Sequence, residues 1–106
     1  MPLSRNIHLS FEEVEFILGD QMDRFYYAIS HCYCIKCRQG FSAELVNYKF
    51  ELTRLNDIGI NGFCKACNSV TGSVIRAEDN IPFNTRATAL WQTRRALKEL
   101  NIKRKK

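Results

Sequence analysis

The sequence predicts an α+β fold, with an antiparallel β-sheet in the middle of the chain, one helix before it and another after it. Two Cys-x2-Cys pairs bracket a segment in which apolar and polar residues alternate, as in a half-buried strand. Helix start signals stand near residue 10, and strong helix formers fill residues 85–100. At 106 residues, the chain is long enough for one small domain.

The first helix is expected over about 11–18. Ser10 can accept a hydrogen bond from the amide of Glu13, while the Glu13 carboxylate reaches back to the amide of Ser10. Gly19 is expected to end the helix in a left-handed conformation. The residues with helical spacing that should face the core are Phe11, Val14, Ile17 and Leu18.

Three segments are predicted to be strands. Residues 25–34, FYYAISHCYC, are rich in aromatic and β-branched residues and lead into the first cysteine pair. Residues 41–56 alternate and should form a long half-buried strand, and residues 69–77 a short one broken by Gly72. The predicted core face of the long strand comprises Val46, Tyr48, Phe50 and Leu52.

The last helix is expected from about Thr85 to Leu100, capped by Asn84 or Thr85. The segment before it, EDNIPFN, should be a loop, because Pro82 disfavours helix at Ile81. At 100° per residue, the predicted core face of this helix comprises Ala89, Leu90, Thr93, Ala96, Leu97 and Leu100.

The composition is that of a globular protein, with 45% hydrophobic and 25% charged residues. The apolar runs are too short to cross a bilayer, and the first ten residues have no apolar core of a signal peptide. We therefore expect a soluble, cytoplasmic protein. In such a compartment thiols stay reduced, so five cysteines fit a metal site better than disulfides.

The cysteine spacing predicts a four-thiolate metal site. Cys34-x2-Cys37 is followed, after 26 residues, by Cys64-x2-Cys67. Two such turns, brought together by a hairpin, would place four sulfurs at about 2.3 Å from one zinc ion. Asn68, directly after the second pair, tolerates the left-handed conformation that these turns need.

These two turns, CIKC and CKAC, each flanked by strand-like sequence, make residues 25–77 resemble the zinc-ribbon proteins. The resemblance implies a zinc β-ribbon with one structural zinc, as in many transcription factors, polymerase subunits and ribosomal proteins. With the two flanking helices, we expect one domain over 1–106. Its expected parts are an N-terminal helical segment (1–24), the ribbon (25–77), a C-terminal helix (84–102) and a basic tail (103–106).

Alternatives to this metal site remain open. Cys32 or His31 could join or replace a ligand, although Cys32 also fits a small buried residue and His31 a residue at the edge of the sheet. Rubredoxin-like iron sites also pair two C-x2-C turns, so the protein could be an electron carrier with iron. Rubredoxins as a group are acidic, whereas this chain has a net charge of +5, which favours zinc.

We expect no catalytic activity. A catalytic zinc keeps one position for water, and four thiolates leave none. The sequence carries no nucleophile elbow and no glycine-rich phosphate loop.

The charge distribution favours nucleic acid as a partner. The first 23 residues have a balance of −4, so the rest carries +9. The basic side of the last helix and the tail could bind DNA or RNA through Trp91, Arg94, Arg95, Lys98, Lys103 and Arg104. In the structural alternative, Trp91 packs against the ribbon or a second subunit, and the basic residues form a merely solvated face. The competing function is a protein-interaction or assembly module that docks another protein or a second copy of the chain.

Overall fold

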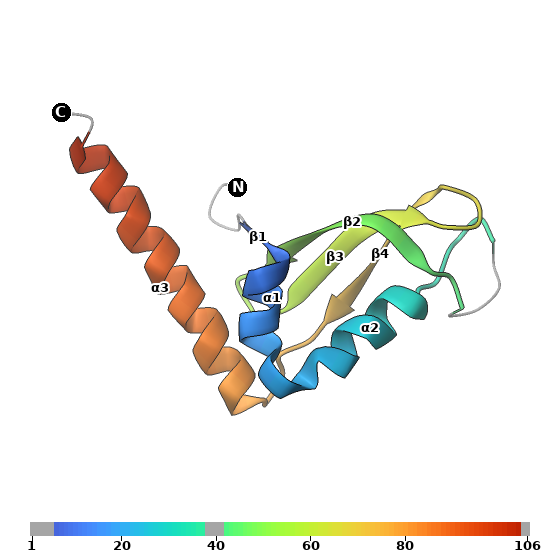
Figure 1. Ribbon diagram of the computed structural model, residues 1–106, viewed down its shortest axis with the longest axis horizontal. Coiled ribbons are helices and arrows are strands. Elements are labelled where there is room, and N and C mark those ends of the chain that lie inside the picture. Colours follow the sequence, from blue (N-terminus) through green and yellow to red (C-terminus); the bar gives the residue numbers. More distant parts are fainter. Residues whose placement is uncertain (1–5, 38–41, 105–106) are drawn as a thin grey trace.

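The computed structural model describes residues 6–37 and 42–104, with the side chains of the last helix described up to residue 97. It confirms the α+β fold: a four-stranded antiparallel sheet with helical segments before and after it (Figure 1). The elements, in chain order, are β1 (Ile7–Leu9), α1 (Phe11–Leu18), η2 (Gly19–Gln21), α2 (Met22–Ser30), β2 (Leu45–Leu52), β3 (Ile58–Cys64), β4 (Val70–Ile75) and α3 (Ile81–Arg104).

Helix α1 has the predicted bounds and cap. The Ser10 hydroxyl accepts from the Glu13 amide at 3.1 Å, and the Ser10 amide donates to the Glu13 carboxylate at 2.9 Å. Gly19 ends the helix at φ 59°, but its ψ of −118° lies outside the left-handed helical region. Phe11 is more exposed than predicted and meets the Phe25 ring edge-on.

The prediction of a strand over 25–34 is wrong, because residues 22–30 form helix α2. Its buried residues, Phe25 and Ala28, are three apart, whereas Tyr26 and Tyr27 are exposed. Helical burial of one face therefore overrides the strand propensity of FYYAI. The N-terminal helical segment runs to residue 30, not 24, and the ribbon-like part begins after it.

The sheet has the strand order β1-β2-β3-β4, and all neighbours are antiparallel. Strand β2 has a bulge between Val46 and Lys49, where Asn47 adopts φ 52°. The bulge shifts the alternation by one residue, so Leu45 is buried and Val46 is not on the core face as predicted. Strand β1, which was not predicted, pairs with the far end of β2.

Strand β4 is continuous and not broken at Gly72. A Cβ at this position would lie 2.7 Å from the carbonyl oxygen of Ile60 on β3, closer than any real Cβ contact. Glycine here allows close approach of two backbones and does not interrupt the strand.

Helix α3 begins at Ile81, four residues before the predicted start. The Asn80 carboxamide oxygen accepts from the Phe83 amide at 3.0 Å and so caps the helix. Pro82 lies in the first turn, where its missing N–H costs no helical hydrogen bond.

The predicted core face of α3 is confirmed at Leu90 and wrong at Thr93, Ala96 and Leu97. Phe83 and Ala87 are buried, with Leu90 and Trp91 packed against the core, whereas Ala96 and Leu97 are exposed. The end of α3 extends past α1 and away from the sheet (Figure 1). Ala96 and Leu97 therefore lie beyond the core.

One apolar cluster joins α1, α2, the start of α3 and one face of the sheet. Its largest fully buried side chains are Phe25, Phe83, Ile17, Leu18, Leu45, Leu52, Ile58 and Ile60. No helix in the described ranges has the length and apolarity needed to cross a membrane.

Candidate metal centre

The first cysteine pair lies in the loop that follows α2. Cys32 and Ala43 form a two-residue β-bridge, with both N–H···O distances at 2.9 Å, and this bridge closes the base of the loop. Cys34 and Cys37 lie in the loop that this bridge closes, Cys34 just before a turn and Cys37 at its end. Residues 38–41 lie outside the described residues.

The second pair lies where β3 turns into β4. The Asn68 amide donates to the Cys64 carbonyl at 2.7 Å, and the Cys64 amide to the Ser69 carbonyl at 2.8 Å. Asn68 adopts φ 62°, as predicted. The turn between Cys64 and Cys67 therefore has the tight geometry that points both sulfurs to one side.

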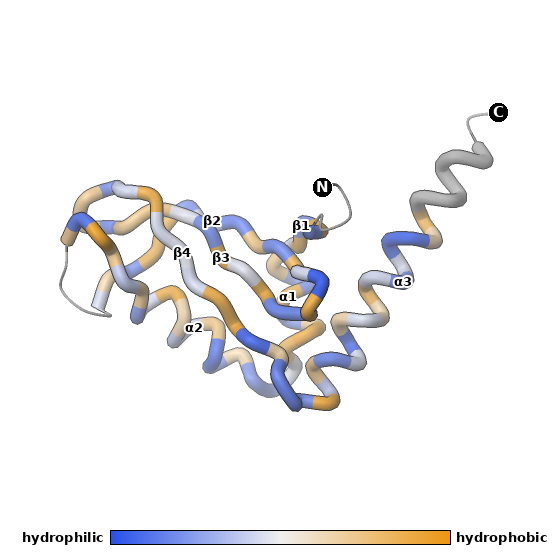
Figure 2. The backbone as a smooth tube through the Cα atoms, turned by 180° about the vertical axis from the view of Figure 1, so that it is seen from behind, coloured by the Kyte–Doolittle hydropathy of each residue, from blue (hydrophilic) through white to orange (hydrophobic). Residues whose placement is uncertain are grey.

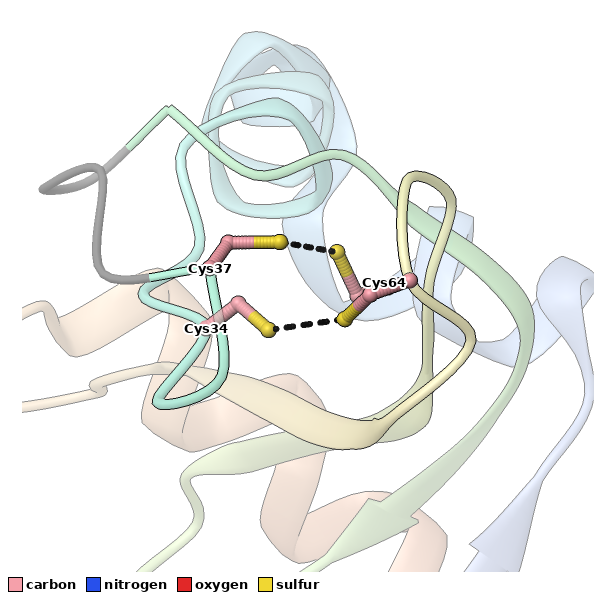
Figure 3. Close-up of side chains that lie close together, drawn as sticks. Cys34, Cys37 and Cys64 are labelled. Atoms are coloured by element: carbon pink, nitrogen blue, oxygen red, sulfur yellow. Dashed lines mark hydrogen bonds between the residues drawn. The ribbon is translucent and has the colours of Figure 1, made fainter.

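The two pairs face one another (Figure 3). The Sγ atoms of Cys34 and Cys67 are 3.4 Å apart, and those of Cys37 and Cys64 are 3.7 Å apart. All four sulfurs lie within 4.8 Å of one another. In a tetrahedron whose centre is about 2.3 Å from each sulfur, the sulfurs are about 3.8 Å apart. The cluster therefore has the size that a single tetrahedral metal ion requires.

The pKa values of the thiols in the cluster also favour a bound cation. Hydrogen bonds from the side chain and backbone of Ser69 lower the pKa of Cys67 to about 6. Hydrogen bonds to Cys67 and the other two sulfurs raise the pKa of Cys37 to about 12. A proton is thus retained on Cys37, because the hydrogen bonds that its thiol makes to the other sulfurs stabilise the protonated form. A divalent cation would replace that proton and allow all four thiols to ionise.

Cys32 and His31 lie outside this cluster. The Cys32 thiol is buried in the apolar core and donates to the Ala28 carbonyl at 3.0 Å. Burial raises its pKa, which disfavours the thiolate that a metal would bind. His31 lies at the end of α2, where its ring stacks on that of Tyr27. It does not lie at the edge of the sheet, as the sequence predicted.

The predicted nucleic-acid residues with described side chains, Trp91, Arg94 and Arg95, lie in different surroundings. Trp91 is partly buried against the core. Arg94 donates to both carboxylate oxygens of Glu13, at 2.6 and 2.7 Å, and to the His8 carbonyl at 2.9 Å. Arg95 is exposed. The side chains of Lys98, Lys103 and Arg104 lie outside the described part of α3, as does the end of the tail.

Sequence reasoning missed the surface of α2, because this segment was assigned to a strand. The helical spacing of Met22, Phe25, Ala28 and Cys32 was the signal that could have found it. It also missed the ion pair between Arg94 and Glu13, which joins residues 81 positions apart. No local pattern predicts such a contact.

No family model, curated protein or solved structure matches the chain. The conclusions about the site therefore rest on its own geometry.

Proposed function

We propose that the chain is a small, non-enzymatic binding module in which Cys34, Cys37, Cys64 and Cys67 hold one structural zinc ion. The observation that carries this proposal is the approach of four sulfurs, from two distant turns, to within 4.8 Å of one another. Four thiolates complete a tetrahedral zinc and leave no position for a reacting water. The metal would join the loop after α2 to the β3–β4 turn and close this end of the sheet.

Elemental analysis of the purified protein tests the metal and its ligands. The wild type should contain one zinc per chain, and Cys64→Ser should lose it. Cys32→Ser is the matched control and should keep the zinc, because the Cys32 sulfur lies outside the cluster. Zinc retained by Cys64→Ser, or lost from Cys32→Ser, would contradict the assignment.

Iron is the competing metal, since four thiolates also bind it in rubredoxin-like electron carriers. Iron–thiolate sites absorb visible light, whereas zinc, with a filled d shell, does not. Visible absorbance that scales with protein concentration, together with iron in the elemental analysis, would show that the four cysteines bind iron and not zinc.

The partner that we propose is nucleic acid. The support is the net charge of +5, the exposed Arg95, and the further cations Lys98, Lys103 and Arg104 in the same part of the sequence. Trp91 and Arg94 are left out of this proposed surface, because they make contacts within the chain.

Salt dependence tests this partner. If four or five phosphates are neutralised, log K should fall with log salt with a slope of about −3.5 to −4.5. Removal of residues 103–106 should make this slope shallower. Failure to retain DNA or RNA at low salt, or an affinity that does not depend on salt, would contradict the proposal.

A second candidate function is protein interaction. The observation in its favour is that Leu97 is 52% exposed on α3, beside an exposed Ala96, although the periodicity predicts both as core residues. Another protein, or a second copy of the chain, would cover this face. A molecular mass that rises with concentration in the wild type but not in Leu97→Asp would favour this function.

A further inference from the structure

Helix α2 and strand β4 run alongside one another (Figure 2). A hollow of about 610 Å³ lies between them. Its wall on the helix side includes Tyr27 and His31, and its wall on the strand side includes Val74 and Arg76. Neither wall contributes a sulfur to the four-cysteine cluster.

The helix side of this hollow carries a preformed aromatic surface. The rings of Tyr27 and His31, one helical turn apart, stack at 4.0 Å with an angle of 10° between their planes. The Nδ1 atom of His31 lies 3.0 Å from the Tyr27 carbonyl oxygen and fixes the imidazole against the helix end. Tyr27 is nevertheless 65% exposed, so its ring adds little to the apolar core.

Basic and acidic side chains both line the hollow near the end of β4. Arg24 donates to the Arg76 carbonyl at 2.7 Å, which places its guanidinium beside the end of β4. Arg76 is exposed. Asp23 and Glu78 also line the hollow, so it is not a purely cationic surface. Their carboxylates can accept hydrogen bonds from base amino groups or sugar hydroxyls.

The surface continues along β4 towards the metal centre. Tyr33 follows His31, and its carbonyl accepts from the Thr71 hydroxyl at 2.9 Å, so this segment lies against β4. A second hollow, of about 640 Å³, follows it and is lined by Ile35, Lys36, Ser69 and Val70. The two hollows thus adjoin the two ends of β4, with Arg76 in the lining of the first and Lys36 in the lining of the second.

We propose that this side of the molecule, between α2 and β4, binds a single-stranded segment of nucleic acid. One base stacks on the exposed ring of Tyr27, and the backbone phosphates lie towards Arg76 and Lys36. Stacking on aromatic rings beside cations is the general mode of binding single strands. The inference rests on the proposed function for the class of partner, but it assigns binding to a different surface from the end of α3.

A single strand fits these observations better than a duplex. Bases in a duplex are stacked on one another and present no face to a tyrosine ring. A binding site that relied on charge alone would also need cations that are not offset by Asp23 and Glu78. The stacked rings therefore point to unpaired bases.

Two neighbouring tyrosines provide a matched test. Tyr26 is 55% exposed on the same helix, but it does not line the hollow, and its ring contacts Phe25. Binding of a fluorescent oligo(dT) of about eight nucleotides would be measured by anisotropy at low salt, with the zinc-loaded protein. Tyr27→Ala should weaken binding by about 5-fold to 150-fold, whereas Tyr26→Ala should change it by less than about 2-fold. Arg76→Ala should also make the salt slope shallower by about one unit.

The outcomes separate this inference from the proposed function. If oligo(dT) binds but Tyr27→Ala and Tyr26→Ala change its affinity equally, the proposed site between α2 and β4 is wrong, while the proposal of nucleic-acid binding stands. If a duplex binds as tightly as the single strand and loses the same affinity in Tyr27→Ala, the assignment to unpaired bases is wrong. If the wild type binds neither probe at low salt, both proposals fail. Far-UV circular dichroism of both tyrosine variants checks that α2 is intact.

Discussion

The end of the sheet where α1 meets α3 differs in construction from the end that carries the cysteines. At the helix end, Ile17 and Phe83 are buried, and two arginines of α3 fasten α1: Arg86 donates to the Ile17 carbonyl at 2.8 Å, and Arg94 pairs with Glu13. At the cysteine end, Ile35 is 74% and Val70 is 80% exposed. The apolar cluster reaches the cysteine end at Cys32 and Leu45, and Leu45 pairs with Cys64. Beyond these residues the two cysteine turns meet through four sulfurs, and we infer that a metal ion holds them together.

Among the changes that test this difference between the two ends, metal removal should have the largest effect. Structural zinc sites of this kind contribute about 10 to 16 kcal/mol of binding free energy, which is comparable to the whole stability of a small domain. A strong chelator should therefore remove most of the β-sheet signal in far-UV circular dichroism, and added zinc should restore it. An unchanged spectrum in zinc-free protein would show that the sheet does not need the metal.

Truncation of the apolar core should have the next largest effect. Phe83→Ala removes a buried ring where α3 begins, and we expect a loss of about 3 to 5 kcal/mol in the free energy of unfolding. Denaturant unfolding of the zinc-loaded protein measures it. Val70→Ala, at an exposed position of the cysteine end, is the control and should cost less than about 0.5 kcal/mol. Equal losses in the two variants would remove the distinction between the ends.

The ion pair between Glu13 and Arg94 should contribute a smaller, pH-dependent amount. Burial raises the pKa of Glu13, but hydrogen bonds from Arg94 and Ser10 outweigh it, so the pKa is lowered. A lowered pKa in the folded state stabilises the protein above the ordinary glutamate pKa, and this contribution is lost as the pH falls through the lowered value. We expect Glu13→Gln to cost about 1 to 1.5 kcal/mol at pH 7.

The difference in urea midpoint between wild type and Glu13→Gln should shrink on acidification. Taking the difference removes the effect of zinc release at low pH, which both proteins share. A difference that stays constant, or grows, between pH 7 and about pH 3 would show that the pair with Arg94 does not lower the pKa of Glu13.

The cap of α1 should give the smallest effect. Ser10→Ala removes the acceptor for the Glu13 amide and should cost about 0.5 to 1 kcal/mol. Ser30→Ala, near the end of α2, is the control, because its hydroxyl donates only to the Tyr26 carbonyl one turn earlier. Similar thermal midpoints for the two variants would mean that the cap does not stabilise α1.

Features that the sequence predicts lie at both ends of the sheet. The cap at Ser10 and the turn at Asn68 follow from residues that lie close together in sequence, and the cluster of four cysteines follows from two Cys-x2-Cys pairs; all three were predicted. The alternation in β2 failed at Asn47, because one inserted residue changes the face of every residue before it. Neither the bulge nor the strand β1 has a strong local signal.

The helices show the limits of periodicity. α2 was assigned to a strand because Tyr26 and Tyr27 favour strands, but only Phe25 and Ala28 are buried, and their spacing is helical. Leu97 follows the apolar stripe of α3 yet is exposed, because the helix extends past α1. A pattern shows which face of a helix is apolar. It does not show where the core ends.

Hydrogen exchange with and without zinc tests the central claim most directly. If the four cysteines bind a structural zinc ion, its removal should abolish amide protection in β3, in β4 and around the Cys32–Ala43 bridge. Protection in α1 and the first half of α3 should persist longer, because their buried side chains lie at the other end. Unchanged protection of β3 and β4 in zinc-free protein would contradict the account.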